Sequence, residues 1–133
     1  MILGIGTDLI EIKRIKNIFN KWEFKFARKI LSYRELQFFS NFTCHCSSSQ
    51  CISYLAKRFA AKEAIGKALG LGIRYPVNFK SIEISNDFYG KPYPVFNDEL
   101  KKFCDNNKYK LHLSISDQKK YAQAFAIIEI LEN

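Results

Sequence analysis

The stretch that decides the fold is Arg58-Phe-Ala-Ala-Lys-Glu-Ala-Ile-Gly-Lys-Ala-Leu-Gly-Leu-Gly72. Together with the residues just before it, this stretch is rich in alanine, leucine and lysine and has no proline, and a Gly-Leu-Gly sequence closes it. Such residues favour a helix, and the glycines favour its end, so we expect one long helix over residues 52–69. The rest of the chain has to pack around that helix.

One acid interrupts the apolar stripe of this helix. At 3.6 residues per turn, the positions that share the stripe are Ile52, Ala56, Phe59 and Glu63. An ionised carboxylate there is costly unless a cation or hydrogen-bond donors meet it. One interpretation is an ordinary Glu63–Lys67 pair, worth only about 0.3–0.5 kcal/mol. The position of Glu63 on the stripe favours the other interpretation, a site that requires a buried acid.

Composition places the chain among globular proteins. It has 133 residues, 47% of them hydrophobic and 15% aromatic, which is enough for one domain with a real core and too much for a disordered chain. No apolar run approaches the roughly 20 residues that span a bilayer, and the N-terminus lacks the basic start of a signal peptide. We expect a soluble, cytoplasmic protein, or one in an organelle lumen if a targeting extension has been removed.

The net charge of +8 attracts acidic partners, but charge alone does not choose among nucleic acid, anionic membrane, phosphorylated ligand and acidic protein. The cations concentrate in residues 13–29, where a single acid, Glu23, accompanies them. A charge run is usually just a solvated face; this one exceeds what solubility requires and indicates a docking surface for an acidic partner. Its members are Lys13, Arg14, Lys16, Lys21, Lys25, Arg28 and Lys29.

Four cysteines raise the question of a metal site. Three of them, with His45 beside Cys46, fall in the polar segment 41–53, and Cys104 stands alone. Neither a C-x-x-C pair nor a zinc-finger spacing is present, so we expect no zinc. The segment is predicted to be a surface loop with thiols in a reducing compartment.

The N-terminus is predicted to be a buried strand over residues 2–8. Gly4, Gly6 and Asp8 project to one face of it. Two glycines beside the acid leave that face bare, so another part of the molecule or a ligand can approach the backbone closely. Asp8 and Glu11 also fit a capping box that opens the following helix, and the two roles need not exclude each other.

Local patterns predict the remaining elements. Ser32 and Glu35 fit a capping box for a short helix. A hairpin is expected from strands at 79–85 and 92–95, followed by a short surface helix at 98–106 and a central closing strand at 121–131.

The strand before the closing one has two distinct faces. Its apolar residues are Leu111, Leu113 and Ile115, and its polar residues are His112, Ser114 and Ser116. One imidazole and two hydroxyls in a row can form a phosphate-binding wall. A polar face turned to solvent explains them equally well.

Four motifs resemble the holo-acyl-carrier-protein synthase family of 4′-phosphopantetheinyl transferases. They are Gly4–Arg14, Arg58–Gly70, Gly90-Lys-Pro92 and His112–Ser116, in the family's order over most of the chain. The resemblance implies one domain over residues 1–133 with an α+β fold, in which a small, mainly antiparallel sheet packs with one long helix. It also implies a homotrimer with active sites between subunits.

The resemblance further implies a reaction and its residues. Phosphopantetheine passes from coenzyme A to a serine of an acidic apo acyl carrier protein, releasing adenosine 3′,5′-bisphosphate; neither nucleic acid nor membrane takes part. Asp8 and Glu63 match the magnesium ligands, and Lys67 and His112 match contacts to coenzyme A phosphates. Further candidate coenzyme A contacts are Arg58, Lys62, Gly70, Gly72 and Ser114; candidate docking residues are Arg14, Lys21, Lys25 and Arg28.

A divalent cation makes chemical sense between the two acids. Carboxylates about 4 Å apart repel by roughly 4 kcal/mol at an effective dielectric constant near 20, and a cation between them reverses that sign. Two protein carboxylates completed by water and phosphate oxygens suit magnesium. The catalytic candidates are Glu63, Lys67 and His112. The base that takes the serine proton stays open among Glu63, a metal-linked water and His112.

The chain departs from the family pattern at two positions. Leu71 stands where a threonine often lies between the two glycines, and Asp117 follows the His112 strand where many members have a second histidine. Two rival hypotheses remain. A non-enzymatic basic module would explain the cations but not Asp8 and Glu63, and a degenerate homologue that binds coenzyme A without turnover is disfavoured by the intact acids and Lys67.

Overall fold

The computed structural model of the chain describes residues 1–43 and 48–132. The chain has an α+β arrangement of helices and antiparallel sheets, as predicted. In chain order the elements are β1 (Ile2–Glu11), α1 (Ile12–Trp22), α2 (Phe24–Ile30), α3 (Tyr33–Thr43), α4 (Ser48–Ala68), η1 (Phe79–Ser81), β2 (Ile82–Asn86), β3 (Pro92–Phe96), α5 (Asp98–Asn106), β4 (Tyr109–Asp117) and β5 (Tyr121–Ile130). None of the helices in this described part is both long and apolar enough to cross a membrane.

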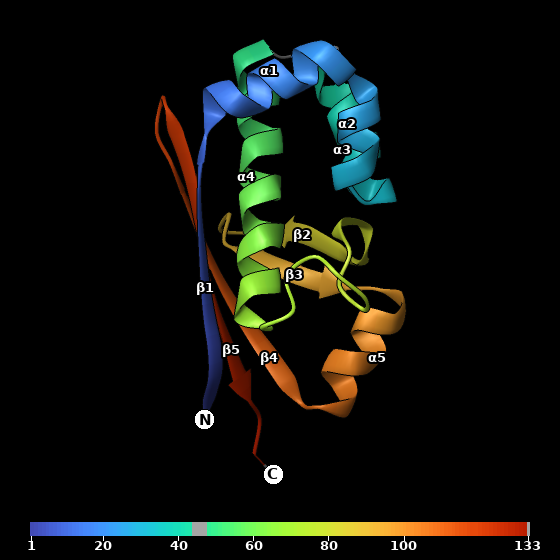
Figure 1. Cartoon of the computed structure of the whole chain (residues 1–133), viewed down its shortest axis with the longest axis vertical. Helices are drawn as coiled ribbons and strands as arrows, with labels where there is room; N and C mark the ends of the chain where they lie inside the picture. Colours follow the sequence, from blue (N-terminus) through green and yellow to red (C-terminus); the bar gives the residue numbers. More distant parts are fainter. Residues whose placement is uncertain (44–47, 133) are drawn as a thin grey trace.

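The long helix α4 forms the centre of the molecule (Figure 1). A three-stranded antiparallel sheet in the order β1-β5-β4 covers one side of it. The short helices α1 to α3 and the β2–β3 hairpin lie on its other side (Figure 1). Because both sides are covered, α4 is buried nearly all round rather than along one stripe only. The closing strand β5 is central in its sheet, as predicted.

The two N-terminal glycines let β1 pack directly on α4. A Cβ added to Gly6 would lie 2.0 Å from the carbonyl oxygen of Ala64, and one added to Gly4 would lie 2.1 Å from that of Ala68. Such distances leave no room for any side chain, since the obstacles are backbone atoms. The predicted close approach to β1 is therefore made by helix α4.

The opposite face of β1 is exposed, so the prediction of a fully buried strand was wrong. Ile5 is 61% exposed and Leu9 62% exposed, and Phe125 on the neighbouring strand is 41% exposed. The alternation of the strand sends these side chains away from α4. The result is an apolar outer sheet face that this chain alone leaves open to solvent.

The proposed Asp8–Glu11 capping box does not form. Asp8 lies within β1, which continues to Glu11, and Glu11 is the N-cap of α1 without a side-chain cap bond. The second box is confirmed. The Ser32 backbone N–H donates to Glu35 Oε1 at 2.9 Å, and the Glu35 N–H donates to Ser32 Oγ at 3.3 Å.

The segment 41–53, which was predicted to be a loop, is helical at both of its ends. Helix α3 extends to Thr43 and α4 begins at Ser48, so Cys51 is a helical residue that is only 4% exposed. Cys44, His45 and Cys46 lie outside the described residues. No group of three or more potential metal-ligating side chains occurs among the residues that are described.

Candidate active site

Asp8 on β1 and Glu63 on α4 come together where the strand runs along the helix (Figure 1). Burial raises the pKa of the Glu63 carboxyl, and the negative charge of Asp8 raises it further. Lys67 and Arg14 act in the opposite direction and lower it. The sequence-predicted acids therefore share one electrostatic site with two cations around it.

Lys67 on α4 forms an ion pair with Asp8 on β1. Its Nζ donates to Asp8 Oδ1 at 3.1 Å and to the backbone oxygen of Thr7 at 3.0 Å. The lysine side chain is 51% exposed while that of Asp8 is 16% exposed. An exposed pair of this kind contributes little to stability, which leaves the ammonium group available to a ligand.

The donor set at this site fits magnesium. Two carboxylates, one partly buried and destabilised by the other, gain from a divalent cation placed between them. Magnesium keeps several waters and is commonly held by one or two carboxylates together with substrate phosphates. The Lys67 ammonium beside Asp8 already occupies a place where positive charge is favoured.

A cavity of about 620 Å³ opens beside Glu63. Its walls are mostly apolar, and two lysines stand among them. The lining residues are Ile18, Trp22, Lys25, Phe26, Lys29, Ile30, Phe59, Glu63 and Phe79. The aromatic residues of these walls, which come from α1, α2, α4 and η1, were not predicted as site residues, because their convergence depends on tertiary packing.

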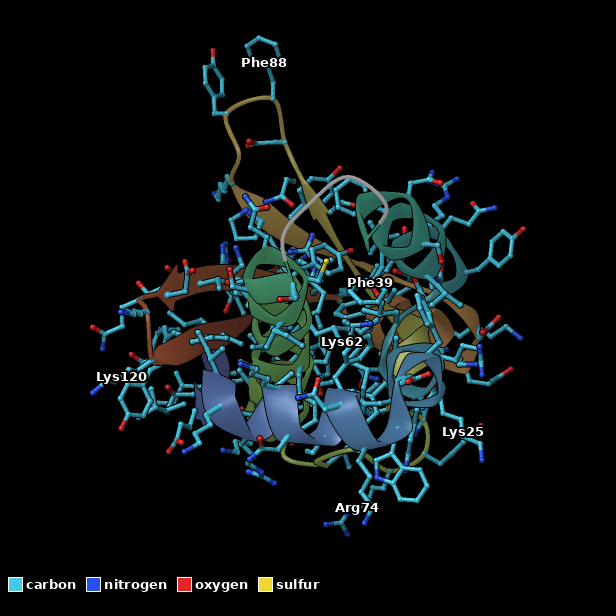
Figure 2. The ribbon with its side chains drawn as sticks, turned by 90° about the horizontal axis from the view of Figure 1, so that it is seen from above. Lys25, Phe39, Lys62, Arg74, Phe88 and Lys120 are labelled. Atoms are coloured by element: carbon cyan, nitrogen blue, oxygen red, sulfur yellow. The ribbon has the colours of Figure 1, made fainter. Side chains whose placement is uncertain are left out.

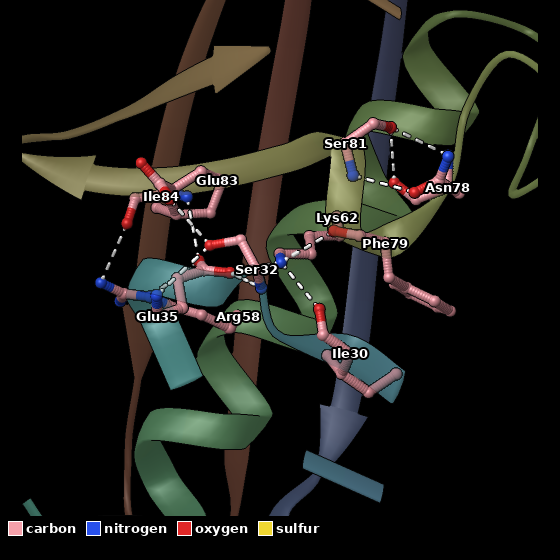
Figure 3. A network of polar contacts seen from close by, with 10 residues as sticks. All are labelled: Ile30, Ser32, Glu35, Arg58, Lys62, Asn78, Phe79, Ser81, Glu83 and Ile84. Carbon is pink, nitrogen blue, oxygen red and sulfur yellow. Dashed lines mark hydrogen bonds and ion pairs between the residues drawn. The ribbon is translucent and has the colours of Figure 1, made fainter. Parts of the chain in front are cut away.

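Lys62 does not face this site. Its side chain is fully buried, and its Nζ donates to the carbonyl oxygens of Ile30 and Phe79 and to Glu35 (Figure 3). Figure 2 shows Lys62 inside the molecule and Lys25 at its surface. An ammonium group has three N–H donors, and all are used here. Lys62 therefore has no donor left for a phosphate, and the prediction that it binds coenzyme A is replaced by an internal role.

Arg58 lies on another side of α4, in the same polar network. Its guanidinium donates to the Ile84 carbonyl at 3.3 Å and to Asn86 Oδ1 at 3.2 Å, and it stacks over the ring of Tyr54 at 4.5 Å. Its Nε is buried and has no hydrogen-bond partner among the residues that the structure describes, although Glu35 lies 3.8 Å away.

His112 and Ser114 lie on the outer face of the sheet. In the register of the sheet, His112 is level with Ile127, which is paired in turn with the outward-pointing Ile5. The imidazole Nε2 is 3.2 Å from Glu129 Oε1, and this hydrogen bond lowers the pKa of the Glu129 carboxyl. Within one chain the sheet thus separates His112 from Asp8 and Glu63.

The other predicted residues occupy the end of α4 and the surface of α1 and α2. Gly70 and Gly72 have φ angles of +75° and +66° and end the helix. The docking candidates Arg14, Lys21, Lys25 and Arg28 are all exposed. Lys21 also lies over the ring of Trp22, 5.2 Å from its centroid.

Comparisons with known proteins show which family the chain resembles. The model of the 4′-phosphopantetheinyl transferase superfamily matches residues 4–126. The chain belongs to the 4′-phosphopantetheinyl transferase superfamily. Among similar members, the holo-[acyl-carrier-protein] synthase of Nitrosospira multiformis is 45% identical over 130 residues, covering 97% of this chain and 99% of that protein.

Solved structures of other transferases of this superfamily share the fold. The holo-[acyl-carrier-protein] synthase of Neisseria meningitidis superposes with a TM-score of 0.88 at 40% identity, covering 97% of this chain and 99% of its own. The synthase of Bacillus anthracis, solved in complex with CoA (3',5'-ADP), gives a TM-score of 0.77 at 36% identity and covers 96% of each chain.

Proposed function

We propose that this transferase is a magnesium-dependent holo-[acyl-carrier-protein] synthase with Asp8 and Glu63 as its metal ligands. The reaction transfers the 4′-phosphopantetheine arm of coenzyme A to a serine of apo acyl carrier protein and releases adenosine 3′,5′-bisphosphate. The observation that carries the proposal is the meeting of Asp8 and Glu63, beside Lys67 and an open cavity, in a member of this superfamily.

The side chains of the site have different proposed roles. Bound magnesium would neutralise negative charge on the pyrophosphate as its bond breaks. Lys67, half exposed and beside Asp8, can hold a phosphate oxygen of coenzyme A through a charge-assisted hydrogen bond. Glu63 Oε and His112 Nε2 are the side-chain atoms that can accept the serine proton.

Coenzyme A has a second set of candidate contacts around Arg58. A cavity of about 320 Å³ lies there, lined in part by Arg34, Arg58, Asn86 and Tyr93. A buried guanidinium nitrogen without a partner can be satisfied by an anionic ligand. Arg58 therefore remains a proposed contact, together with Gly70 and Gly72 at the end of α4.

The complete site requires more than one copy of the chain. His112 and Ser114 lie on the outer sheet face, so only a neighbouring copy can bring them to Asp8 and Glu63. The exposed apolar residues of β1 on that face can be buried in such a contact. We propose a homotrimer with each site shared between two subunits.

The acidic carrier protein is proposed to dock on the exposed cations Arg14, Lys21, Lys25 and Arg28. Lys25 also lines the cavity that reaches Glu63. A carrier bound to this surface would therefore be held close to the metal site. Complementary charge of this kind speeds encounter and fixes orientation.

The decisive experiment incubates the protein with apo carrier protein, coenzyme A and magnesium and measures the mass of the carrier. The carrier is expected to gain the mass of one phosphopantetheine, and the gain should stop when the metal is chelated. Glu63→Gln is expected to nearly abolish turnover while circular dichroism stays unchanged, because one metal-binding charge is lost. An unmodified carrier after incubation with folded wild-type protein would refute the function.

A further inference from the structure

Lys62 is a fully buried cation whose every donor is used inside the protein. Its Nζ lies 2.7 Å from the Ile30 oxygen, 2.5 Å from Glu35 Oε1 and 2.9 Å from the Phe79 oxygen (Figure 3). These partners belong to α2, α3 and η1 and lie 32, 27 and 17 residues from Lys62 in the sequence. One side chain of α4 therefore fastens three other elements to the central helix.

Two of these partners form walls of the cavity beside Glu63. Ile30 is the last residue of α2 and Phe79 is the first of η1, and both residues line that cavity. The last carbonyl groups of a helix have no partner within the helix, and Lys62 supplies one to Ile30. Because Lys62 directly precedes Glu63, one turn of α4 carries the acid and also contacts the walls of the cavity through Lys62.

The network around Lys62 fixes its position from several directions. Glu35 Oε2 accepts a hydrogen bond from the Ile84 N–H at 2.9 Å. Glu83 Oε1 accepts one from Ser32 Oγ at 2.8 Å. A buried ion pair is weak evidence for stability, because desolvation offsets the attraction between the charges. The importance of the Lys62–Glu35 pair lies instead in the positions at which it holds the surrounding elements.

We propose that the mostly apolar cavity beside Glu63 takes the pantetheine arm of coenzyme A, and that Lys62 is a positioning residue that fixes the walls of this cavity and thereby sets the affinity for coenzyme A. This inference rests on the proposed function. Lys62 itself does not touch the substrate. Its two carbonyl contacts keep Ile30 and Phe79 at a fixed spacing from the helix that carries the acid.

Two variants test the role of the hydrogen bonds separately from that of the charge. Lys62→Arg keeps the charge opposite Glu35, but its planar fork cannot reproduce three hydrogen bonds from one nitrogen. Lys62→Met removes the charge and all three hydrogen bonds, while Glu35 keeps Arg58, whose Nε lies 3.8 Å from Glu35 Oε2. Lys80→Met is the matched control, because it removes an exposed lysine next to Phe79 in the same turn.

The KM for coenzyme A should rise about tenfold in both Lys62 variants, as expected when charge-assisted hydrogen bonds that hold the walls are lost. The kcat at saturation should change little, since Asp8, Glu63 and Lys67 are untouched. Trp22 is the only tryptophan of the chain and lines the cavity, so its fluorescence reports on the walls directly. Acrylamide should quench it more strongly in the variants than in the control.

Wild-type KM and wild-type quenching in variants that fold normally would overturn the positioning role and leave Lys62 a purely stabilising residue. A fall in kcat with an unchanged KM would overturn it as well. Failure of the wild-type protein to modify the carrier would instead count against the proposed function. The quenching of Trp22 does not depend on turnover, so the two failures are distinguishable.

Discussion

At the residue scale, Gly6 makes the approach of β1 to α4 possible. A Cβ at this position would lie 2.0 Å from the Ala64 oxygen and 2.6 Å from the Ala68 nitrogen, so strand or helix must move. Gly6→Ala should lower the free energy of unfolding by roughly 1–3 kcal/mol or more. It should also reduce activity, because Asp8 two residues later is displaced from Glu63.

Urea denaturation and the carrier mass assay measure both effects. Thr7→Ala is the control, since the side chain of Thr7 points to the outer face of the same strand. If Gly6→Ala is as stable as the wild-type protein, β1 and α4 can move apart at little cost in free energy. That result would contradict the prediction.

Two lysines near Glu63 show what the sequence can and cannot predict about single residues. Lys67, four residues after Glu63, lies on the same side of the helix, and the i, i+4 rule already favours it as a site residue. Lys62, one residue before, is turned by about 100° and points elsewhere. Its partners could not be predicted, because Glu35 and Phe79 meet it only after the elements pack.

At the scale of elements, α1 and α2 carry the proposed docking surface, and their cations are not equivalent. Arg28→Glu should raise the KM for carrier protein about tenfold and weaken its dependence on salt, while the KM for coenzyme A stays unchanged. Arg14→Glu should raise the carrier KM and also lower kcat. The positive charge of Arg14 lowers the pKa of Glu63 and so favours its ionised form. A glutamate at position 14 would raise that pKa instead.

Steady-state kinetics at varied salt measure these effects. Lys101→Glu on α5 is the control, since that exposed lysine belongs to neither docking helix. An unchanged carrier KM in Arg28→Glu would remove α2 from the docking surface.

The helices and strands themselves were largely predictable. The long helix, the hairpin and the central closing strand follow from local composition and periodicity, and the structure contains all three. The end of β1 was not predictable locally. This strand continues beyond Asp8 because it pairs with β5 as far as Glu11, which is opposite Tyr121. The partner strand lies more than a hundred residues away, so no local pattern records that pairing.

At the scale of the whole molecule, a site shared between subunits makes a quantitative prediction. Glu63→Gln and His112→Ala chains should each be nearly inactive alone. When they are unfolded and reassembled together in equal amounts, about a quarter of the sites should combine an intact Glu63 with an intact His112. The mass assay should then recover a corresponding fraction of the wild-type activity.

Native mass spectrometry provides the control for this mixture, because it shows whether mixed oligomers form. Mixed oligomers without any recovered activity would mean that both residues act within one chain. Full activity of the His112→Ala chain alone would mean that His112 has no role in the reaction.

The motifs in the sequence predicted the family, which the comparisons confirm, and they supplied the candidate site residues, but not how the sheet divides those residues. Asp8 and His112 come from strands of the same sheet, and their opposite orientation depends on the register between β1, β5 and β4. Register is set by pairing across long stretches of chain. For that reason a list of candidate residues could be drawn up from the sequence while their spatial grouping could not.

The packing of glycine against alanine has an evolutionary consequence. Backbone contact between β1 and α4 sets the spacing of Asp8 and Glu63, and it involves none of the large side chains that line the neighbouring cavity. A substitution in those walls can therefore change the shape of the cavity while the acids keep their spacing. The contacts that set the distance between the two acids are thus separate from the side chains that shape the neighbouring cavity.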